Sequence, residues 1–238
     1  MSRIAAIVPA AGLGTRMGAE MPKQFLKLDG VPLVIFTVRR LAACAAITDF
    51  FIAARAEEVA GLEARVAQEK LGRPVSVVRG GDSRQESVGN ALAKVSPDTE
   101  IVLVHDAVRP CITREQIERV IAEAQAHGAA ILGIPAIDTI KEVRRTSLPE
   151  GVALITSTIP RERIVQAQTP QAFSAALLKE AFARAQQDGV TASDEAGLVE
   201  RMGRDVYVVL GSERNLKITR PADMELARYY LDQERMRK

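Results

Sequence analysis

The chain contains 238 residues, which is enough for one large α/β domain or two small ones. Hydrophobic residues make up 47% and charged residues 26%, a balance that is typical of globular proteins and excludes global disorder. The 32 basic and 30 acidic residues leave a net charge of +2, which excludes an extended nucleic-acid-binding surface, so any anion site has to be local. Cys44 and Cys111 form neither a disulfide framework nor a metal-ligand spacing, and we expect both to be small apolar residues in a reducing compartment.

The amino terminus carries an apolar run that Pro9 and the following glycines end within about ten residues. A run of this length is too short to cross a membrane, and a convincing signal-peptide cleavage pattern is missing. We therefore expect a cytoplasmic protein without a membrane partner.

Short apolar runs alternate with stretches of helical period through the first half of the chain. The apolar runs are continuous, as in buried parallel strands, and lie at Ile4–Val8, Phe50–Ala54, Val75–Val78, Ile101–His105 and Ala129–Ile134. Helices are expected at about Leu33–Ala45, Glu57–Leu71, Arg84–Lys94 and Arg114–His127, the last between an N-cap at Thr113 and a stop at Gly128. This alternation predicts an α/β fold with a mostly parallel sheet covered by helices on both faces.

The alternation of apolar runs with helical stretches ends after Pro135. Residues Thr139–Arg145 and Val152–Thr158 alternate in polarity and flank a turn rich in Pro and Gly, which predicts an antiparallel hairpin. A two-stranded ribbon is marginal alone in water, so we expect this arm, about residues 138–163, to pack on a second subunit in a homodimer. The remaining expected elements are helices at about Ser174–Gln187 and Asp194–Met202, a strand at Val206–Leu210 and a last helix from Pro221. We expect a single domain, residues 1–238, with the inserted arm.

The most informative segment, Pro9–Gly18, directly follows the first expected strand. Glycines at such a strand end let backbone N–H groups approach phosphate oxygens closely. A dinucleotide-binding loop is a poor match, because Gly18 comes one place late and the residues about 20 positions further on, Leu28-Asp29-Gly30, form a turn and not a strand end. Arg16 within the loop, with Lys23 seven residues later, suits a triphosphate better.

Several motifs in chain order resemble one family. They are PAAGLGTRMG followed by PKQF, Gly80-Gly81-Asp82-Ser83-Arg84 with Ser87, Val104-His105-Asp106-Ala107-Val108-Arg109-Pro110, Gln168-Thr169-Pro170-Gln171 and Lys217-Ile218-Thr219. Together they resemble the 2-C-methyl-D-erythritol 4-phosphate cytidylyltransferases, which have a Rossmann-like nucleotidyltransferase fold. The resemblance implies transfer of CMP from CTP to a polyol phosphate with release of pyrophosphate.

The resemblance also implies roles for individual residues. Those expected to act in catalysis are Arg16, Lys23, Arg161 and Lys217, with Arg163 as an alternative to Arg161. In the family this arginine comes from the neighbouring subunit on the arm. Nucleotide-binding residues are expected at Ala10, Ala11, Gly12, Leu13, Gly14, Gly81, Asp82, Ser87 and Ala107. Substrate-binding residues are expected at Asp106, Arg109, Thr169 and Ser193.

Asp106 is also the candidate metal ligand. A carboxylate at a strand end beside bound phosphates suits Mg²⁺, which commonly takes one or two carboxylates, phosphate oxygens and water. The simpler alternative is that Asp106 caps the next segment. His105 and His127 are interpreted as structural residues.

Other functions stay open. The same motifs fit a cytidylyltransferase acting on another polyol phosphate, such as ribitol 5-phosphate, and a related sugar-phosphate enzyme using UTP or GTP. A non-catalytic nucleotide-binding module is disfavoured, because Arg16, Lys23, Asp106 and Lys217 are all present.

Overall fold

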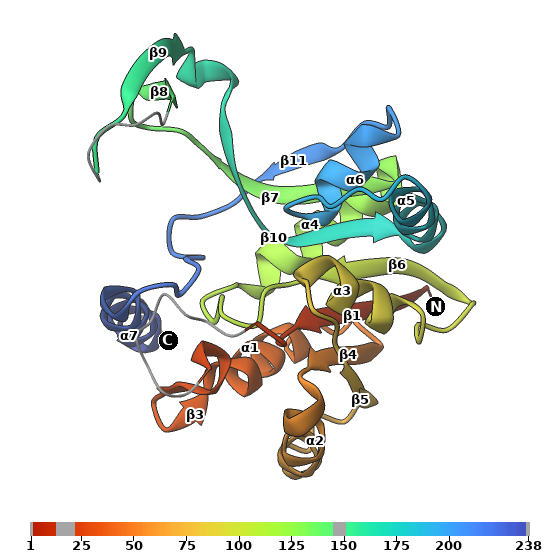
Figure 1. Cartoon of the computed structure of the whole chain (residues 1–238). Helices are drawn as coiled ribbons and strands as arrows, with labels where there is room; N and C mark the ends of the chain where they lie inside the picture. Colours follow the sequence, from red (N-terminus) through yellow and green to blue (C-terminus); the bar gives the residue numbers. More distant parts are fainter. Residues whose placement is uncertain (1, 13–21, 145–150, 237–238) are drawn as a thin grey trace.

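The computed structural model describes residues 2–12, 22–144 and 151–236. A seven-stranded sheet forms the centre of the molecule, in the order β11-β7-β10-β6-β1-β4-β5 (Figure 1). Its strands are β1 (Arg3–Pro9), β4 (Asp49–Ala54), β5 (Val75–Arg79), β6 (Thr99–Val104), β7 (Ala129–Pro135), β10 (Val165–Ser174) and β11 (Tyr207–Leu210). The expected mostly parallel sheet is confirmed, since β10 alone runs antiparallel to its neighbours β6 and β7.

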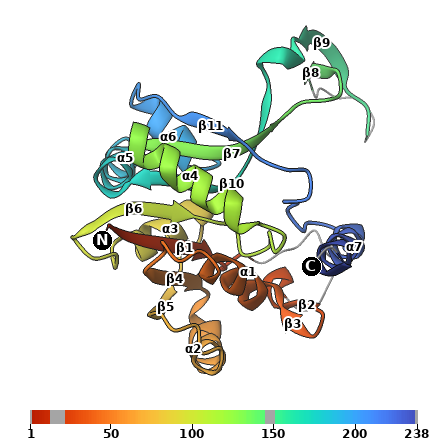
Figure 2. The ribbon, with the colours of Figure 1, turned by 180° about the vertical axis from the view of Figure 1, so that it is seen from behind.

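Helices cover both faces of this sheet, as predicted. One face carries α1 (Leu33–Ala42), α2 (Val59–Gln68) and α4 (Arg114–His127), whose buried aliphatic side chains share one core with the sheet. The other face carries α3 (Arg84–Leu92), α5 (Ala175–Gln187) and α6 (Glu195–Arg201). Figure 1 shows α3 in front of β1 and β4, and Figure 2, from the other side, shows α4 in front of β7 and β10.

The expected elements agree with the observed ones to within a few residues. The predicted helix at Glu57–Leu71 is divided into a 3-10 turn, η3 (Ala56–Glu58), and the shorter α2. The predicted α4 has the observed bounds, because Thr113 Oγ1 accepts a hydrogen bond from Gln116 N and Gly128 ends the helix with φ 89°.

The carboxyl-terminal helix α7 (Pro221–Met236) packs away from the main sheet on a separate small core. That core joins α7 to the hairpin of β2 (Lys27–Leu28) and β3 (Val31–Pro32) and to the loop after β6. In the described part of the chain, no helix is long and apolar enough to cross a membrane.

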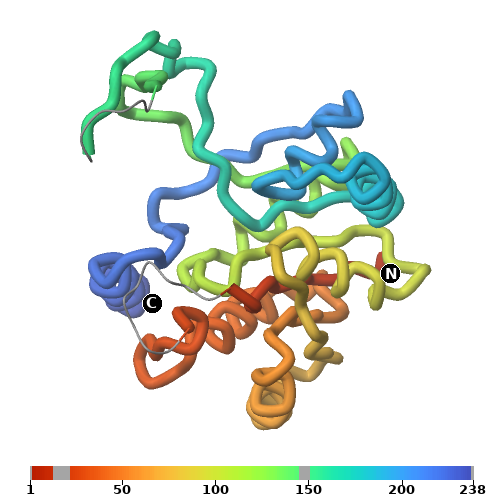
Figure 3. Tube along the Cα trace, in the orientation of Figure 1, coloured from red at the N-terminus to blue at the C-terminus, as the bar shows by residue number. Residues whose placement is uncertain are grey.

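A second two-stranded sheet consists of β8 (Ile140–Arg144) and β9 (Leu154–Ile159), which pair antiparallel. Figure 3 shows this segment extending from the β7 and β10 end of the main sheet. The 3-10 turn η4 (Arg161–Arg163) connects it to β10. The predicted turn between the two strands, residues 147–151, lies outside the described residues except for Gly151.

Candidate functional site

The first part of the site is the chain after β1. Ala10 N donates to Ala53 O at 2.7 Å, which holds the end of β1 against β4. The Gln24 side chain, only 2% exposed, donates through Nε2 to Ala10 O at 2.7 Å and to Gly12 O at 3.0 Å. These bonds fix the start of the expected phosphate loop from its inner side. The rest of that loop, including the predicted site residues Leu13, Gly14 and Arg16, lies outside the described residues.

A second loop, between β5 and α3, lies against the first. A Cβ on Gly80 would lie 2.7 Å from Ala11 Cβ and 2.8 Å from Ser87 Oγ, so the close approach of the two loops requires glycine. Ser87 Oγ accepts from Gly81 N at 3.1 Å and donates to Ser83 O at 2.8 Å. These contacts fix a turn whose polar groups border the site.

The amino terminus of α3 is closed by a capping box. Ser83 Oγ accepts from Glu86 N at 3.0 Å, and Glu86 Oε2 accepts in return from Ser83 N at 3.2 Å and also from Asp82 N at 2.7 Å. Because Glu86 holds these backbone groups, the conformation of residues 81–83 exists before any ligand binds.

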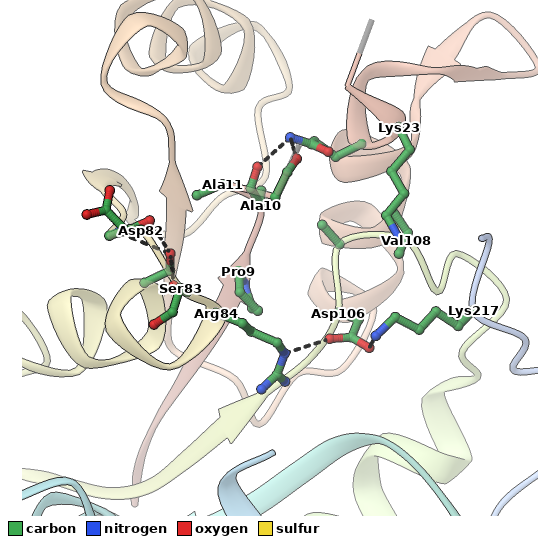
Figure 4. Close-up of a pocket in the computed structure, with 15 residues that line it drawn as sticks. Pro9, Ala10, Ala11, Lys23, Asp82, Ser83, Arg84, Asp106, Val108 and Lys217 are labelled. Atoms are coloured by element: carbon green, nitrogen blue, oxygen red, sulfur yellow. Dashed lines mark hydrogen bonds and ion pairs between the residues drawn. The ribbon is translucent and has the colours of Figure 1, made fainter. Parts of the chain in front are cut away.

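These two loops and the ends of β1 and β6 enclose a pocket of about 180 Å³ (Figure 4). It is lined by Pro9, Ala10, Ala11, Gly12, Lys23, Gln24, Gly81, Asp82, Ser83, Arg84, Ser87, Asp106, Ala107, Val108 and Lys217. The pocket therefore lies at the carboxyl ends of the parallel strands, where open α/β sheets bind their ligands.

Asp106, directly after β6, is surrounded by cations. Its Oδ1 accepts from Arg84 Nε at 3.2 Å, and its Oδ2 lies 2.9 Å from Lys217 Nζ and 3.5 Å from Arg109 Nε. Figure 4 shows Arg84 and Lys217 reaching the carboxylate from opposite sides. Burial alone would raise the pKa of Asp106, but the three cations hold that pKa well below its usual range. Asp106 is therefore an anion at neutral pH and holds Arg84 and Lys217 at the pocket wall, with Arg109 behind it.

His105 supports this arrangement from behind. The ring is fully buried, and burial lowers the pKa of His105 to about 4, so the ring is neutral at neutral pH. Nε2 lies 3.1 Å from Arg109 O, which can only accept, so Nε2 carries the proton and Nδ1 accepts from Thr169 Oγ1 at 3.0 Å. Thr169 Oγ1 in turn accepts from Asp106 N at 3.0 Å. This chain of hydrogen bonds fixes the backbone of residues 105–109, as expected for a structural histidine.

The segment that carries Lys217 is anchored by Asn215, which is fully buried. Asn215 O accepts from Arg109 Nη1 at 2.7 Å, and Asn215 Nδ2 donates to Thr169 O at 2.8 Å. The Thr169–Pro170 peptide bond is cis. Lys217, Arg109 and Thr169, which lie far apart in the sequence, are thus joined around Asp106.

Most of the predicted site residues meet at this pocket. Those that line it are Ala10, Ala11, Gly12, Lys23, Gly81, Asp82, Ser87, Asp106, Ala107 and Lys217. Arg109 and Thr169 lie behind Asp106 and contact it. Ser193 is exposed and is not part of the pocket wall.

Arg161 and Arg163 are not brought to this pocket within one chain. Both lie in η4, and Arg161 Nη1 donates to Ile137 O at 2.6 Å on the same projecting segment.

Sequence reasoning assigned no role to three residues that build the site: Gln24, Arg84 and Asn215. It placed Glu195, with Ser193, among positions that resemble the family's substrate side, but it did not predict the contact of Glu195 with Arg84. Gln24 and Arg84 belong to motifs that were recognised, so their place in those motifs was an available signal. Glu195 resembles any acidic residue in the first turn of a helix, and its contact with Arg84 spans 111 positions. Asn215 likewise carries no local signal for its long-range bonds.

The fit of a divalent cation depends on Asp106. Among residues 2–12, 22–144 and 151–236, no three His, Cys, Asp or Glu side chains are grouped to hold a metal ion. Both oxygens of Asp106 already contact cations. Asp106 therefore fits an ion whose other ligands are phosphate oxygens and water, as in a metal-bound triphosphate. Such an ion could contact Oδ2 once Lys217 has moved away from it. The described residues do not fit a metal site made of protein ligands alone.

A pocket with preformed backbone turns on one side and cations around one carboxylate on the other suits two phosphate-bearing substrates. The fold around it is that of a nucleotidyltransferase. The crystal structure of 4-diphosphocytidyl-2C-methyl-D-erythritol synthase from Anaerococcus prevotii superposes with a TM-score of 0.81 and 26% identity, over 97% of this chain and 99% of the other. The sequence model described as 2-C-methyl-D-erythritol 4-phosphate cytidylyltransferase matches residues 4–233. The chain belongs to this family.

Individual members of the family are similar to this chain over nearly its full length. The chain is 53% identical to the protein of this name from Acidobacterium capsulatum, over 99% of this chain and 100% of the relative. It is 49% identical to that from Solibacter usitatus, over 99% and 98%. The crystal structure of the Thermus thermophilus protein of this name is 35% identical, with a TM-score of 0.75 over 95% of this chain and 98% of the other.

Proposed function

We propose that this enzyme transfers CMP from CTP to 2-C-methyl-D-erythritol 4-phosphate, giving 4-diphosphocytidyl-2-C-methyl-D-erythritol and pyrophosphate for isoprenoid synthesis by the non-mevalonate route. The observation that carries the proposal is the pocket itself, in which residues 10–12 and 81–83 face the cations around Asp106. The identity of 53% with a relative of that name supports the choice of acceptor over ribitol 5-phosphate.

In the proposed reaction, a phosphate oxygen of the acceptor attacks the α-phosphorus of CTP. The new P–O bond forms as the bond from the α-phosphorus to the bridging oxygen breaks, and pyrophosphate leaves with that electron pair. Two polyanions have to meet, so positioning and charge neutralisation supply most of the catalysis. We assign neutralisation at the α-phosphorus to Lys23 and Arg16.

The remaining predicted residues divide between the two substrates. The backbone of Ala10, Ala11, Gly12, Leu13 and Gly14 would hold the triphosphate, and Gly81, Asp82, Ser87 and Ala107 would contact the cytidine. Lys217 would leave Asp106 to orient the acceptor phosphate, while Asp106, Arg109, Thr169 and Ser193 would contact the acceptor. Mg²⁺, held by the triphosphate and by Asp106, would neutralise phosphate charge when bound.

We further propose a cytoplasmic homodimer in which each single-domain chain, residues 1–238, lends its arm to its partner. The arm, residues 138–163, exposes Val143, Val152, Leu154 and Ile155 by 44%, 54%, 49% and 58%. A two-stranded ribbon with these apolar side chains in water is marginal, and burying them against a second copy would stabilise it. Arg161, or alternatively Arg163, would then reach the partner's site.

The test is pyrophosphate release by the purified protein with CTP and Mg²⁺, supplied in parallel with methylerythritol phosphate and with ribitol 5-phosphate. Release with methylerythritol phosphate alone is expected. Release with ribitol 5-phosphate alone would refute the acceptor but retain the chemistry, and CTP binding without release in either case would favour a binding module.

Shared sites can be tested by mixing two inactive variants, Arg161→Ala and Lys217→Ala, after unfolding and refolding them together. Random pairing gives half heterodimers, each with one intact site, so about a quarter of wild-type activity should return if Arg161 acts across the interface. Full activity of Arg161→Ala alone, with loss in Arg163→Ala, would transfer the role to Arg163. Activity that stays absent in the mixture would contradict shared sites.

A further inference from the structure

A buried ion pair stands behind the pocket. Glu195, the first residue of α6, is 1% exposed, and its two carboxylate oxygens accept from Arg84 Nη1 at 2.7 Å and Arg84 Nη2 at 3.0 Å. This parallel two-bond geometry fixes the plane of the guanidinium as well as its position, which a single contact could not do.

Arg84 uses a third N–H group, that of Nε, on the reaction side. Its Nε donates to Asp106 Oδ1 at 3.2 Å, and the side chain borders the pocket (Figure 4). Arg84 is also the first residue of α3, directly after the turn of residues 81–83. A continuous chain of contacts, Glu195–Arg84–Asp106, therefore joins the nucleotide side of the pocket to its acceptor side.

Glu195 is itself held in place. Gln171, 1% exposed and located on β10, donates through Nε2 to Asp194 Oδ2 at 2.8 Å and accepts through Oε1 from Ala196 N at 3.1 Å. The two residues on either side of Glu195 are thus tied to the central sheet. The carboxylate cannot follow Arg84 if the guanidinium moves, so the pair defines one orientation of Arg84.

We propose that Glu195 is a positioning residue for acceptor binding, which acts through Arg84 to set the orientation of Asp106. This inference rests on the proposed function. By occupying both terminal nitrogens of Arg84, Glu195 leaves Asp106 with a single contact from that side. When Lys217 turns to the acceptor phosphate, Oδ2 of Asp106 is then available to polar groups of the acceptor.

The substitution Glu195→Gln tests the proposed positioning role specifically. The amide keeps the size of the carboxylate, but its NH₂ group would face a guanidinium N–H, and two donors repel each other. The terminal nitrogens of Arg84 would then turn to the nearest remaining carboxylate, Asp106, and bind it through two parallel bonds. Asp106 would be drawn toward Arg84 and away from the acceptor.

The experiment measures steady-state kinetics and calorimetric CTP binding for the full-length protein. Glu195→Gln should raise KM for methylerythritol phosphate by about tenfold or more, the value of one charged hydrogen-bond contact, while Kd for CTP changes by less than about threefold. Arg84→Lys, which loses the two-bond geometry but leaves Glu195 in place, should have the same selective effect. The acceptor KM of the double variant should be no higher than that of either single variant, because both substitutions disrupt the same Glu195–Arg84 ion pair.

The matched control is Glu180→Gln, whose carboxylate lies 2.6 Å from Arg184 on the exposed side of α5 and should leave both constants unchanged. A parallel loss of CTP and acceptor binding, multiplied losses in the double variant, or an unchanged acceptor KM would overturn the proposal. If Glu195→Gln does not fold, Arg84→Lys alone decides between these outcomes. A wild-type protein without turnover would refute the proposed function, whereas an active wild type with unaffected variants would refute this inference alone.

Discussion

Replacing His105 tests the electrostatics behind the pocket. In the folded protein, burial lowers the pKa of His105 from 6.5 to about 4. The unfolded chain therefore takes up a proton as the pH falls below about 6.5, while the folded protein resists it until about pH 4. A histidine with a depressed pKa contributes its full stability above 6.5 and loses it as the pH falls toward 4.

The size of the loss follows from the two pKa values. The pKa values of the folded and unfolded forms differ by about 2.5, and at about 1.4 kcal/mol per pKa unit the largest possible loss of stability is about 3.5 kcal/mol. At pH 5 the unfolded form is almost fully protonated and the folded form is still neutral, so the loss is about 2 kcal/mol. Solvent screening does not reduce this free-energy difference, because the His105 side chain is fully buried.

The variant His105→Gln removes the titration and keeps one donor for Arg109 O and one acceptor for Thr169 Oγ1. Urea unfolding of both proteins, without nucleotide or metal, at pH values between about 7.5 and 5 gives each free energy of unfolding. The wild type should lose about 2 kcal/mol more than the variant over this range, whatever their difference at the higher pH. Taking the difference between the proteins cancels the other titrating groups. Parallel pH dependences would refute a neutral, buried His105.

Three further predictions concern the pocket. Gln24→Leu removes both bonds to the carbonyls of Ala10 and Gly12 and should raise KM for CTP by about tenfold, measured by pyrophosphate release, with unchanged acceptor KM. Gly81→Ala would bring a Cβ to 2.4 Å from Glu86 Cβ and should weaken CTP binding in calorimetry by about tenfold or more. Gly61→Ala, where the new Cβ meets nothing within 4 Å, is the control that should bind CTP normally. Lys217→Ala should lower kcat/KM for the acceptor by about two orders of magnitude with little change in Kd for CTP. An equal loss for both substrates would contradict that assignment.

Local chemistry made much of the fold predictable. Helix α4 is the clearest case, because a capping threonine, an apolar face and a terminal glycine lie within sixteen residues. Strand β10 was not predicted, although it lies near the centre of the sheet. Its sequence, VQAQTPQAFS, is polar, and the polarity is satisfied by distant groups: Gln168 Nε2 donates to Ser212 O at 2.8 Å, 44 positions away. A periodicity argument interprets buried polar residues as exposed ones, so it misses strands of this kind.

The candidate site divides in the same way. The side that we propose binds the nucleotide is formed by two glycine-containing loops, and a loop with a few glycines and a capping residue is recognisable along the sequence. The proposed acceptor side depends on pairings such as Arg84 with Glu195, separated by 111 positions, and Asn215 with Thr169, separated by 46. Only the fold brings such residues together, so resemblance suggested part of this side and the structure supplied the rest.

The connection between the arm and the sheet has a mechanical consequence. The ladder of β7 and β10 extends to Val165 opposite Pro135, and the hydrogen bond from Ala136 N to Ile164 O at 3.1 Å continues it beyond the sheet. The arm therefore begins where a ladder through the centre of the molecule ends. Thr169, which bonds to Asp106 N, lies four residues beyond Val165 on β10, where the pairing with β7 shifts between Gln168 and Gln171. Force applied to the arm by a neighbouring chain would travel along two hydrogen-bonded strands to the backbone beside the reacting groups. In the proposed homodimer, this connection would let the site of each chain respond to the presence of its neighbour.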